Sequence, residues 1–470
     1  MLDRFPLRYW AERFPNDIAL VFEDKTFSWA ELKIRVESMR ALLEGQGISK
    51  QGVVACVGKN SLTMLDLVLT CADLGAIFAP IAPAPTKVIN KKLNTIAPSL
   101  VYWQDQEPLT HSFPSLMPSD TSPSNPPSSF DETLFGENLF DENLISSLIF
   151  TSGTTGDPKA VAHQACHHLA SAKGLLEVFE FSKGDTWLLS LPLYHVSGLA
   201  IIWRWLATGS TLVMPSTQGL IQDLKAVSHA SLVSTQLKAL LDSGEKTELK
   251  RVLLGGSDIP SELISAANRA GIEVWMGYGL TEAASTVTAK RAEGIHSAGM
   301  ALPNRALKLS DDEIWIKGET LAQGYYQNGS VIPLELEDGW YATGDLGQWH
   351  EGELVVRGRV DNRFISGGEN ISCEEIESAL MSLNSISNAI VIPVADDIYG
   401  QRPVAVLETQ VLANKPDYDA QLANRLEKFK WPVEYHLMSC EAKEQGGIKI
   451  SRKWLKEWLC LERSKMKRSE

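Results

Sequence analysis

The chain has 470 residues, of which 44% are hydrophobic and 22% are charged, a composition typical of a globular protein rather than a disordered one. This length is too great for one compact core and predicts roughly two to four domains or subdomains. The formal net charge of −14 argues against a nucleic-acid-binding protein, because a phosphate backbone requires a basic surface. Composition leaves both a monomer and a homo-oligomer open.

The cysteines and apolar stretches bear on where the protein works. The six cysteines are widely spaced and form no CxxC pair, so neither a zinc site nor a disulfide framework is indicated. The N-terminus carries charges and lacks the apolar core of a signal peptide. The most apolar stretch, residues 62–82, is interrupted by Asp66, Asp73 and Pro80, which favours a buried helix followed by a strand. We therefore expect a cytoplasmic protein with reduced cysteines and no membrane span.

The first part of the chain alternates between helical and strand patterns. Apolar residues recur at helical spacing from Trp29 to Leu43, and strands are expected at 53–58 and 77–81 on either side of a helix that ends near Gly75. This alternation predicts a parallel α/β sheet. Residues 107–143 are rich in Pro, Ser, Asp and Asn and predict an exposed connection.

The α/β alternation resumes at Leu144 and continues to Met276. After Gly299 the strands become shorter and glycines more frequent, which predicts a β-rich subdomain. A last compact unit is expected from Asp361, with a helix at 373–383 and a strand at 389–394. The predicted fold is therefore α/β, with a large domain of α/β subdomains and a β-rich subdomain at residues 1–360, and a small α+β domain at residues 361–470.

The segment TSGTTGDPK, residues 151–159, directly follows a predicted strand. Glycines let backbone N–H groups approach an anion, hydroxyl groups add donors, and lysine adds charge, so the segment predicts a phosphate-binding loop. It is not a Walker loop, because Pro158 precedes Lys159 and no Ser or Thr follows it. Composition alone more often indicates a flexible surface turn.

Further motifs follow in chain order and give the loop its context. They are residues 191–198 (LPLYHVSG), 254–257 (LGGS), 277–282 (GYGLTE), 341–346 (YATGDL), 358–362 (GRVDN), 366–370 (SGGEN) and 446–452 (GGIKISR). Together with the loop, this ordered series resembles the signature of the adenylate-forming superfamily, which includes acyl-CoA synthetases, luciferases and peptide-synthetase adenylation domains. The resemblance extends from residue 151 to residue 452.

The resemblance implies binding of ATP and Mg²⁺. Tyr278 is expected to stack on adenine, Thr281 to bind a phosphate, Glu282 to hold Mg²⁺, Asp345 to accept hydrogen bonds from the ribose hydroxyl groups, and Arg359 to contact the nucleotide. An aromatic face suits a purine and a carboxylate suits a hard cation. The other residues implied in nucleotide binding are Thr151, Ser152, Gly153, Thr154, Thr155, Gly156, Lys159, Gly256, Ser257, Gly277 and Gly279.

The resemblance also implies two half-reactions, in which a carboxylate first attacks ATP to give an acyl-adenylate and the thiol of coenzyme A then displaces AMP. Lys449 is the expected catalytic lysine, although Ile448 stands where the family usually has glycine. Asp361 is the expected hinge of a mobile C-terminal lid, and Gly367 and Gly368 would let the backbone approach coenzyme A. The other residues that the resemblance implies in catalysis are Thr281, Glu282 and His195.

The acid is indicated by residues 191–206, 234–241 and 446–452, which together resemble the o-succinylbenzoate–CoA ligase branch of the superfamily, a branch that serves menaquinone synthesis. This acid carries a second carboxylate, so its pocket needs an apolar slot with a cationic contact. His195, Ser197 and Gly198 are expected in the pocket wall. Arg204 is the candidate cation, and the alternative is that its side chain extends to the surface.

Three other functions share parts of this pattern. A medium-chain or aryl acyl-CoA ligase would retain every nucleotide motif and differ only in the acid pocket. An amino-acid adenylation domain would need a carboxylate for the substrate amine and usually a downstream carrier domain, and neither is evident. A non-catalytic nucleotide-binding protein is disfavoured by the presence of Glu282, Asp345 and Lys449 together.

Overall fold

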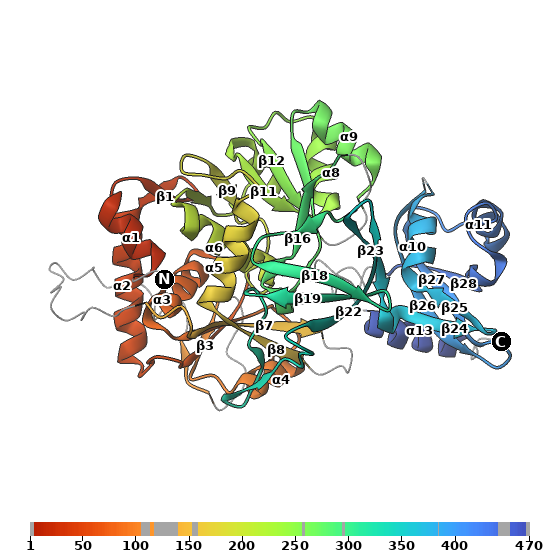
Figure 1. Ribbon diagram of the computed structural model, residues 1–470, viewed down its shortest axis with the longest axis horizontal. Helices are drawn as coiled ribbons and strands as arrows, with labels where there is room; N and C mark the ends of the chain where they lie inside the picture. Colours follow the sequence, from red (N-terminus) through yellow and green to blue (C-terminus); the bar gives the residue numbers. More distant parts are fainter. Residues whose placement is uncertain are drawn as a thin grey trace. The chain divides into compact units, whose positions relative to one another are not determined.

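The computed structural model divides the chain into two compact units (Figure 1). Unit 1 contains Met1–Lys308 and Trp315–Tyr341, and unit 2 contains Leu309–Ile314 and Ala342–Glu470. The described residues are 4–104, 113–116, 140–152, 158–255, 259–293, 297–383, 385–439 and 452–466. The boundary expected at 360/361 concerns which residues rotate together, and it stays a prediction.

The first large sheet of unit 1 has eight strands. In spatial order they are β21 (Ser330–Pro333), β20 (Gly324–Gln327), β8 (Pro158–Gln164), β7 (Ile145–Ser152), β4 (Ile77–Ile81), β3 (Val53–Val57), β5 (Leu100–Trp103) and β6 (Ser115–Leu116). The strands from β7 to β6 pair in parallel, which confirms the predicted parallel α/β sheet. On β3, Val54 and Cys56 enter one core and Val53, Ala55 and Val57 enter another, so both faces are buried.

The second large sheet of unit 1 has nine strands. In spatial order they are β17 (Met300–Ala301), β16 (Thr288–Arg291), β13 (Glu273–Met276), β12 (Arg251–Leu254), β11 (His229–Leu232), β9 (Thr186–Leu188), β10 (Thr211–Val213), β1 (Ile18–Phe22) and β2 (Lys25–Ser28). The strands from β13 to β1 pair in parallel, and both edges are antiparallel. A short separate hairpin joins β14 (Gly279–Leu280) to β15 (Ser285–Thr286).

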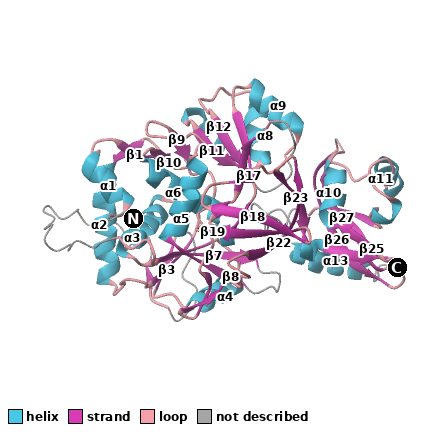
Figure 2. Ribbon diagram, in the orientation of Figure 1, coloured by secondary structure: helices cyan, strands magenta, loops and turns pink. Residues whose placement is uncertain are grey.

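Helices cover both faces of the two sheets. They are α1 (Pro6–Arg13), α2 (Trp29–Gly45), α3 (Leu62–Leu74), α4 (Thr86–Ile96), α5 (Ala165–Leu176), α6 (Val196–Thr208), α7 (Leu220–Asp223), α8 (Ser234–Ser243) and α9 (Ser261–Arg269), with 3₁₀ turns η3 (Leu224–Ala226) and η4 (Thr281–Ala283). Helices α2, α3, α5 and α6 share one core with both sheets, whereas α4 covers the outer face of the first sheet and α8 and α9 that of the second. Figure 2 shows α5 and α6 lying between strands of the two sheets.

The helix boundaries follow from local signals in the sequence. A capping box starts α2, because the Ser28 side chain accepts from the Glu31 N–H and the Glu31 carboxylate accepts from the Ser28 N–H at 2.7 Å. Helix α3 ends where Gly75 adopts a φ of 74°. Both helices and the strand β4 confirm the expectations for residues 29–81. No helix in the described part of the chain is long and apolar enough to cross a membrane.

The β-rich part predicted after Gly299 contains β18 (Arg305–Ser310), β19 (Glu313–Gly318), β22 (Tyr341–His350) and β23 (Glu353–Arg359). The chain passes from one unit to the other within β18, β19 and β22. In unit 2, β22 and β23 pair as an antiparallel hairpin.

The remainder of unit 2 is a small α+β fold. Its sheet has the order β25 (Glu369–Ser372), β24 (Arg363–Ser366), β27 (Gly400–Thr409) and β26 (Ile386–Asp396), with β28 (Glu434–Leu437) parallel to β27. Around it lie α10 (Cys373–Met381), α11 (Lys415–Leu422), α13 (Arg452–Met466), η5 (Val360–Asn362) and η6 (Lys428–Lys430). Helices α10 and α11 pack on one face and α13 on the other, which confirms the predicted helix at 373–383 and strand at 389–394.

Candidate functional site

The predicted phosphate loop connects two antiparallel strands. Thr151 on β7 pairs with Lys159 on β8, and Ser152 pairs with Pro158, so both ends of the loop meet at the tip of a hairpin. Lys159 is exposed, and its Nζ lies 4.9 Å from the ring centroid of Tyr325. The hairpin therefore presents a lysine beside the loop. Outside the described residues lie Gly153, Thr154, Thr155, Gly156 and the side chain of Ser152.

The GYGLTE segment depends on glycine for close backbone approach. A Cβ atom at Gly277 would lie 2.1 Å from the carbonyl oxygen of Thr288, and one at Gly279 would lie 2.0 Å from that of Ser285. No side chain fits at either position. The segment consequently folds back on β15 and β16, where the Tyr278 N–H donates to the Thr288 hydroxyl group at 3.0 Å. Tyr278 itself is half-buried.

The turn that carries Thr281 and Glu282 is strained and held from outside. The following residues, Ala284 and Ser285, have φ values of 51° and 91°, a conformation that costs non-glycine residues roughly 1–3 kcal/mol each. Donors from three other segments hold its carbonyl groups: His163 Nε2 to Thr281 at 2.7 Å, Ala322 N to Glu282 at 2.8 Å, and Ser171 Oγ to Ala284 at 2.6 Å. Such external contacts explain how the turn retains its conformation.

His163 was not a candidate in the sequence, yet it joins β8 to this turn. Burial, together with His167, lowers the pKa of His163 to about 3, so the ring is neutral at pH 7. A carbonyl oxygen can only accept, and the Nε2 atom must therefore carry the proton and donate to Thr281. The strand that leaves the phosphate loop thus fixes the position of Thr281.

Glu282 and Lys159 both contact Tyr325, which the sequence did not single out. The Tyr325 hydroxyl group donates to Glu282 Oε1 at 3.2 Å and lies 3.3 Å from the hydroxyl group of Tyr341. Burial raises the pKa of Tyr325 to about 12, so it is a phenol and a donor at pH 7. Unit 1 thereby brings Lys159, Thr281 and Glu282 together from separate motifs.

The predicted wall of the acid pocket surrounds the start of α6. His195 is the N-cap residue, its ring lies 4.9 Å from that of Tyr194, and burial lowers its pKa. A Cβ atom at Gly198 would lie 2.2 Å from the carbonyl oxygen of Pro192, so this glycine allows the first helical turn to pack on the preceding loop. Ser197 is half-buried. The roles of these residues toward an acid stay predictions.

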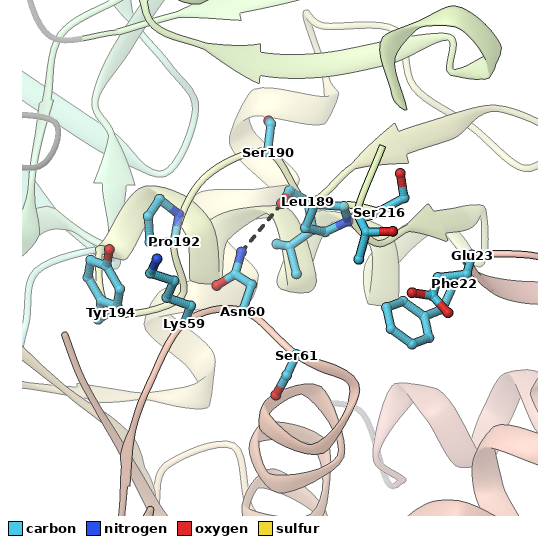
Figure 3. Close-up of a pocket in the computed structure, with 12 residues that line it drawn as sticks. Phe22, Glu23, Lys59, Asn60, Ser61, Leu189, Ser190, Pro192, Tyr194 and Ser216 are labelled. Carbon is cyan, nitrogen blue, oxygen red and sulfur yellow. Dashed lines mark hydrogen bonds between the residues drawn. The ribbon is translucent and has the colours of Figure 1, made fainter. Parts of the chain in front are cut away.

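A cavity of about 440 Å³ lies beside this loop (Figure 3). The Asn60 side chain reaches across to the loop, where its Nδ2 donates to the Leu191 carbonyl group at 2.9 Å and its Oδ1 accepts from the Leu193 N–H at 2.8 Å. Sequence patterns gave no signal for this clamp. The lining residues are Phe22, Glu23, Lys59, Asn60, Ser61, Leu189, Ser190, Pro192, Tyr194, Pro215, Ser216 and Thr217, so Arg204 does not line this cavity.

Arg204 on α6 is only 2% exposed, and the alternative that its side chain extends to the surface is wrong. Its Nη2 donates to the Thr286 hydroxyl group at 3.1 Å, and its Cζ lies 5.3 Å from the ring centroid of Trp187. Its Nε has no hydrogen-bond partner among the described residues. Burial, together with the charge of Arg305, lowers the pKa of Arg204 to about 9.

Arg305 on β18 is a second buried cation that the sequence did not single out. It is 8% exposed, and it donates to the carbonyl groups of Thr286, of Pro303 at 3.0 Å and of Ser171 at 3.3 Å. Burial lowers its pKa to about 10. Two guanidinium groups therefore flank Thr286, and within the described part of the chain neither forms an ion pair with a carboxylate.

Unit 2 brings together a different set of predicted residues. Asp345 on β22 is 9% exposed and accepts from Arg359 Nη1 at 2.7 Å, while Arg359 Nε donates to Asp361 at 2.9 Å. Burial alone would lower the pKa of Arg359, but Asp345 and Asp361 outweigh it and raise the pKa above its usual value. The ribose, nucleotide and hinge candidates thus form one charged cluster.

Gly367 and Gly368 form the turn between β24 and β25. Their φ values of 60° and 91° match a two-residue hairpin turn that requires the left-handed region at both positions. The hairpin thus accounts for both glycines, and a role in binding coenzyme A stays a prediction. Ser372 occupies the N-cap position of α10, and its side chain makes no capping hydrogen bond. Outside the described residues lie Gly256, Ser257 and Lys449.

The chain is similar to known proteins over nearly its whole length. It is 38% identical over 461 residues to the 2-succinylbenzoate–CoA ligase of Salmonella typhimurium, covering 97% of this chain and 98% of that relative. Among solved structures, it matches an arginine-to-lysine variant of E. coli MenE with bound OSB-AMS at a TM-score of 0.88 and 36% identity, covering 98% and 99% of the two chains.

A more distant solved structure has a nucleotide and a metal bound. The o-succinylbenzoate coenzyme A synthetase (MenE) of Bacillus subtilis in complex with ATP and magnesium ion matches at a TM-score of 0.82 and 26% identity, covering 92% of this chain and 95% of that one. The match to the AMP-binding enzyme family extends over residues 7–326. The chain therefore belongs to the AMP-binding enzyme family.

Proposed function

We propose that this protein is an ATP-dependent acid–CoA ligase that converts 2-succinylbenzoate (o-succinylbenzoate) into its CoA thioester through an acyl-adenylate, a reaction of menaquinone synthesis. Family membership and relatives named for this activity support the reaction class. We place the reaction in the cytoplasm, where ATP and coenzyme A are available, and the reactants are small molecules.

The observation that carries the choice of acid is Arg204. A buried cation is costly unless an anion pairs with it, and the described residues supply none. The substrate carries two carboxylates, of which only one is activated, so the other is available as this anion. Ser197 lies seven residues before Arg204 and therefore faces the same side of α6. This face of the helix thus carries polar groups from Arg204 toward the N-cap residue His195.

The nucleotide end fits ATP with Mg²⁺. The described residues contain no cluster of three His, Cys, Asp or Glu side chains that could enclose a metal. This suits Mg²⁺, which is usually held by one or two carboxylates together with substrate phosphates. Glu282 would be that carboxylate, and the bound ion would neutralise charge on the phosphates. Lys159, Thr281 and the hydroxyl-rich loop would hold the phosphates, and Tyr278 the adenine.

We propose that unit 2 separates the two half-reactions. Lys449 would hold the reacting carboxylate and the α-phosphate during adenylation. A rotation about Asp361 would then remove Lys449 and bring the turn at Gly367 and Gly368 to coenzyme A. The ion pair that Arg359 forms with Asp345 orients a carboxylate acceptor suited to the ribose hydroxyl groups.

The test is CoA-thioester formation with a panel of acids. The panel contains 2-succinylbenzoate and two matched monocarboxylates, 2-butyrylbenzoate and 4-oxo-4-phenylbutanoate, each of which lacks one of its carboxylates, together with benzoate and octanoate. We expect kcat/KM for 2-succinylbenzoate to exceed that for every monocarboxylate by at least about 100-fold, because the single carboxylate of a monocarboxylate can pair with Arg204 or be activated by ATP, but cannot do both. Equal or better turnover of octanoate or benzoate would assign the enzyme to another acid.

The enzyme class is tested separately by acid-dependent exchange of pyrophosphate into ATP. Wild-type protein should catalyse this exchange. Lys449→Ala should lose it, while still converting the preformed acyl-adenylate and coenzyme A into thioester. Absence of exchange in wild-type protein with every acid of the panel would contradict the ligase function itself.

A further inference from the structure

Two side chains of opposite charge, which are expected to bind different parts of MgATP, contact the same tyrosine. The ammonium group of Lys159 is 4.9 Å from the ring centroid of Tyr325, and the carboxylate of Glu282 accepts from the hydroxyl group of that ring at 3.2 Å. Lys159 forms no ion pair with a carboxylate in the described part of the chain. The cation thus contacts the aromatic ring and the anion contacts the hydroxyl group of the same side chain.

Strand register sets this position. Tyr325 and Tyr326 on β20 pair with Val161 and Ala160 on β8, the strand that begins beside the phosphate loop. Because side chains alternate along a strand, Tyr326 enters the outer core of the first sheet, where it is 8% exposed, and Tyr325 takes the opposite face. The two adjacent tyrosines therefore lie on opposite faces of the same sheet.

The separation has a chemical consequence. A lysine that pairs with the carboxylate would neutralise the group needed for Mg²⁺, and the carboxylate would withdraw the charge needed for a phosphate. An aromatic face stabilises the ammonium group without consuming it, and a phenol that donates to a carboxylate fixes its orientation as outer-shell partners do for metal ligands. Neither contact with Tyr325 neutralises the charge that it touches.

We propose that Tyr325 is a positioning residue that holds Lys159 and Glu282 apart and orients each for MgATP. The inference rests on the proposed role of Glu282 as the Mg²⁺ ligand. It concerns nucleotide binding alone, so it stands or fails independently of the identity of the acid.

The experiment measures ATP binding by titration calorimetry with the full chain, with and without Mg²⁺ and in the absence of any acid. Tyr325→Phe keeps the ring and removes the hydroxyl group. We expect it to raise the Mg²⁺ concentration at half-saturation by about tenfold or more, because outer-shell partners of metal ligands have effects of that size. Its affinity for ATP without Mg²⁺ should equal that of wild type. Tyr326→Phe is the matched control and should change neither quantity.

A second pair of variants tests the separation of charges. Tyr325→Leu removes the ring, so Lys159 can pair with Glu282 and the affinity for ATP without Mg²⁺ should fall several-fold. Adding Glu282→Gln to Tyr325→Leu removes the competing charge and should restore that affinity. A role in folding alone would not produce this rescue, and thermal unfolding of each variant checks that it is folded.

Unchanged Mg²⁺ dependence in Tyr325→Phe, or failure of Glu282→Gln to restore ATP binding in Tyr325→Leu, would overturn the proposal. If wild-type protein showed no acid-dependent activity while the expected binding results were obtained, the proposed ligase function would be contradicted. The role of Tyr325 in nucleotide binding would still hold.

Discussion

Two regions of unit 1 bury arginine side chains in different surroundings. Where α1, α2 and α3 meet, Arg40 is 5% exposed and pairs with Asp73 at 3.4 Å and with Glu44 at 2.9 Å. Arg8 contacts both oxygens of the same Asp73, at 2.5 and 2.8 Å. Every buried charge in this region therefore has an opposite charge beside it.

Where α6 meets β15, Arg204 and Arg305 have only hydroxyl and carbonyl oxygens of Thr286 and neighbouring backbone as acceptors among the described residues. Removing a guanidinium group from water is unfavourable in both regions. The first region offsets this with carboxylates of the fold, and the second leaves a net positive site that an anionic ligand can complete. The difference separates buried charges that the fold itself pairs with carboxylates from the buried charge that we propose pairs with the substrate.

The largest expected effect is on the paired region. Asp73→Ala leaves Arg40 and Arg8 without their shared carboxylate, so the free energy of unfolding should fall by roughly 3–5 kcal/mol. Urea denaturation followed by tryptophan fluorescence measures this change. Glu12→Ala breaks the exposed pair with Arg4 and should change the same quantity by less than roughly 1 kcal/mol. Equal effects of the two substitutions would mean that burial does not distinguish these pairs.

The next effect concerns the unpaired region. Arg204→Met should lower kcat/KM for 2-succinylbenzoate by about 100-fold, or about 2.7 kcal/mol, because a charged hydrogen-bond donor to the substrate is lost. Its free energy of unfolding should stay equal or rise, since an apolar side chain replaces a buried cation that lacks a carboxylate partner. Initial-rate kinetics and urea denaturation measure the two quantities. A variant that is as destabilised as Asp73→Ala and fully active would reverse the comparison.

A smaller effect is a pH dependence of stability in the helical region, where α1, α2 and α3 meet. Burial raises the pKa of Asp66 to about 6, although Arg35 lowers it. Between the unfolded pKa near 3.8 and the folded pKa near 6, the folded state binds more protons than the unfolded state, so stability decreases as pH rises through this window. The change from pH 4 to pH 6 should be about 2 kcal/mol.

The measurement is the free energy of unfolding at pH 4, 5 and 6 for wild-type protein and Asp66→Asn. The variant cannot ionise at this position, so its stability should lose that part of the decrease. Identical pH profiles of the two proteins would contradict a raised pKa for Asp66.

The smallest effect tests how Arg204 is held. Thr286→Val keeps the shape of the side chain and removes the hydroxyl acceptor of Arg204, which should raise KM for 2-succinylbenzoate by about three- to tenfold through looser positioning of the guanidinium group. KM for ATP should not change. Thr70→Val removes a buried hydroxyl group in the helical region and should leave both constants unaltered. A matching rise in both variants would assign the effect to general loosening of unit 1.

Much of the fold could be predicted because its signals are local. The spacing of apolar residues predicted α2, the interruptions by Asp66 and Asp73 predicted α3 rather than a membrane span, and continuous apolar runs predicted β3 and β4. The order of the motifs predicted the family and brought Lys159, Thr281 and Glu282 into one hypothesis. These patterns depend on residues that are neighbours in sequence.

The residues that sequence reasoning missed act through contacts that no local pattern records. Tyr325 lies far along the chain from Lys159, Arg305 reaches Thr286 from another strand, and His163 on β8 donates to Thr281 in the turn η4. Each of these residues lies in a strand, and its neighbours in sequence form no recognisable motif. Only the packing of the strands decides which atoms they meet.

The sequence by itself thus determined the succession of helices and strands, the glycines that GYGLTE and SGGE require, and the family. The tertiary structure decided the state of the charges. Arg204 stands in an apolar helix that fits a surface arginine as well as a buried one, and its burial beside Arg305 follows from how α6 packs between two sheets. The interaction energy of a charged group depends on the burial and the charges around it, and these neighbours come from distant parts of the chain.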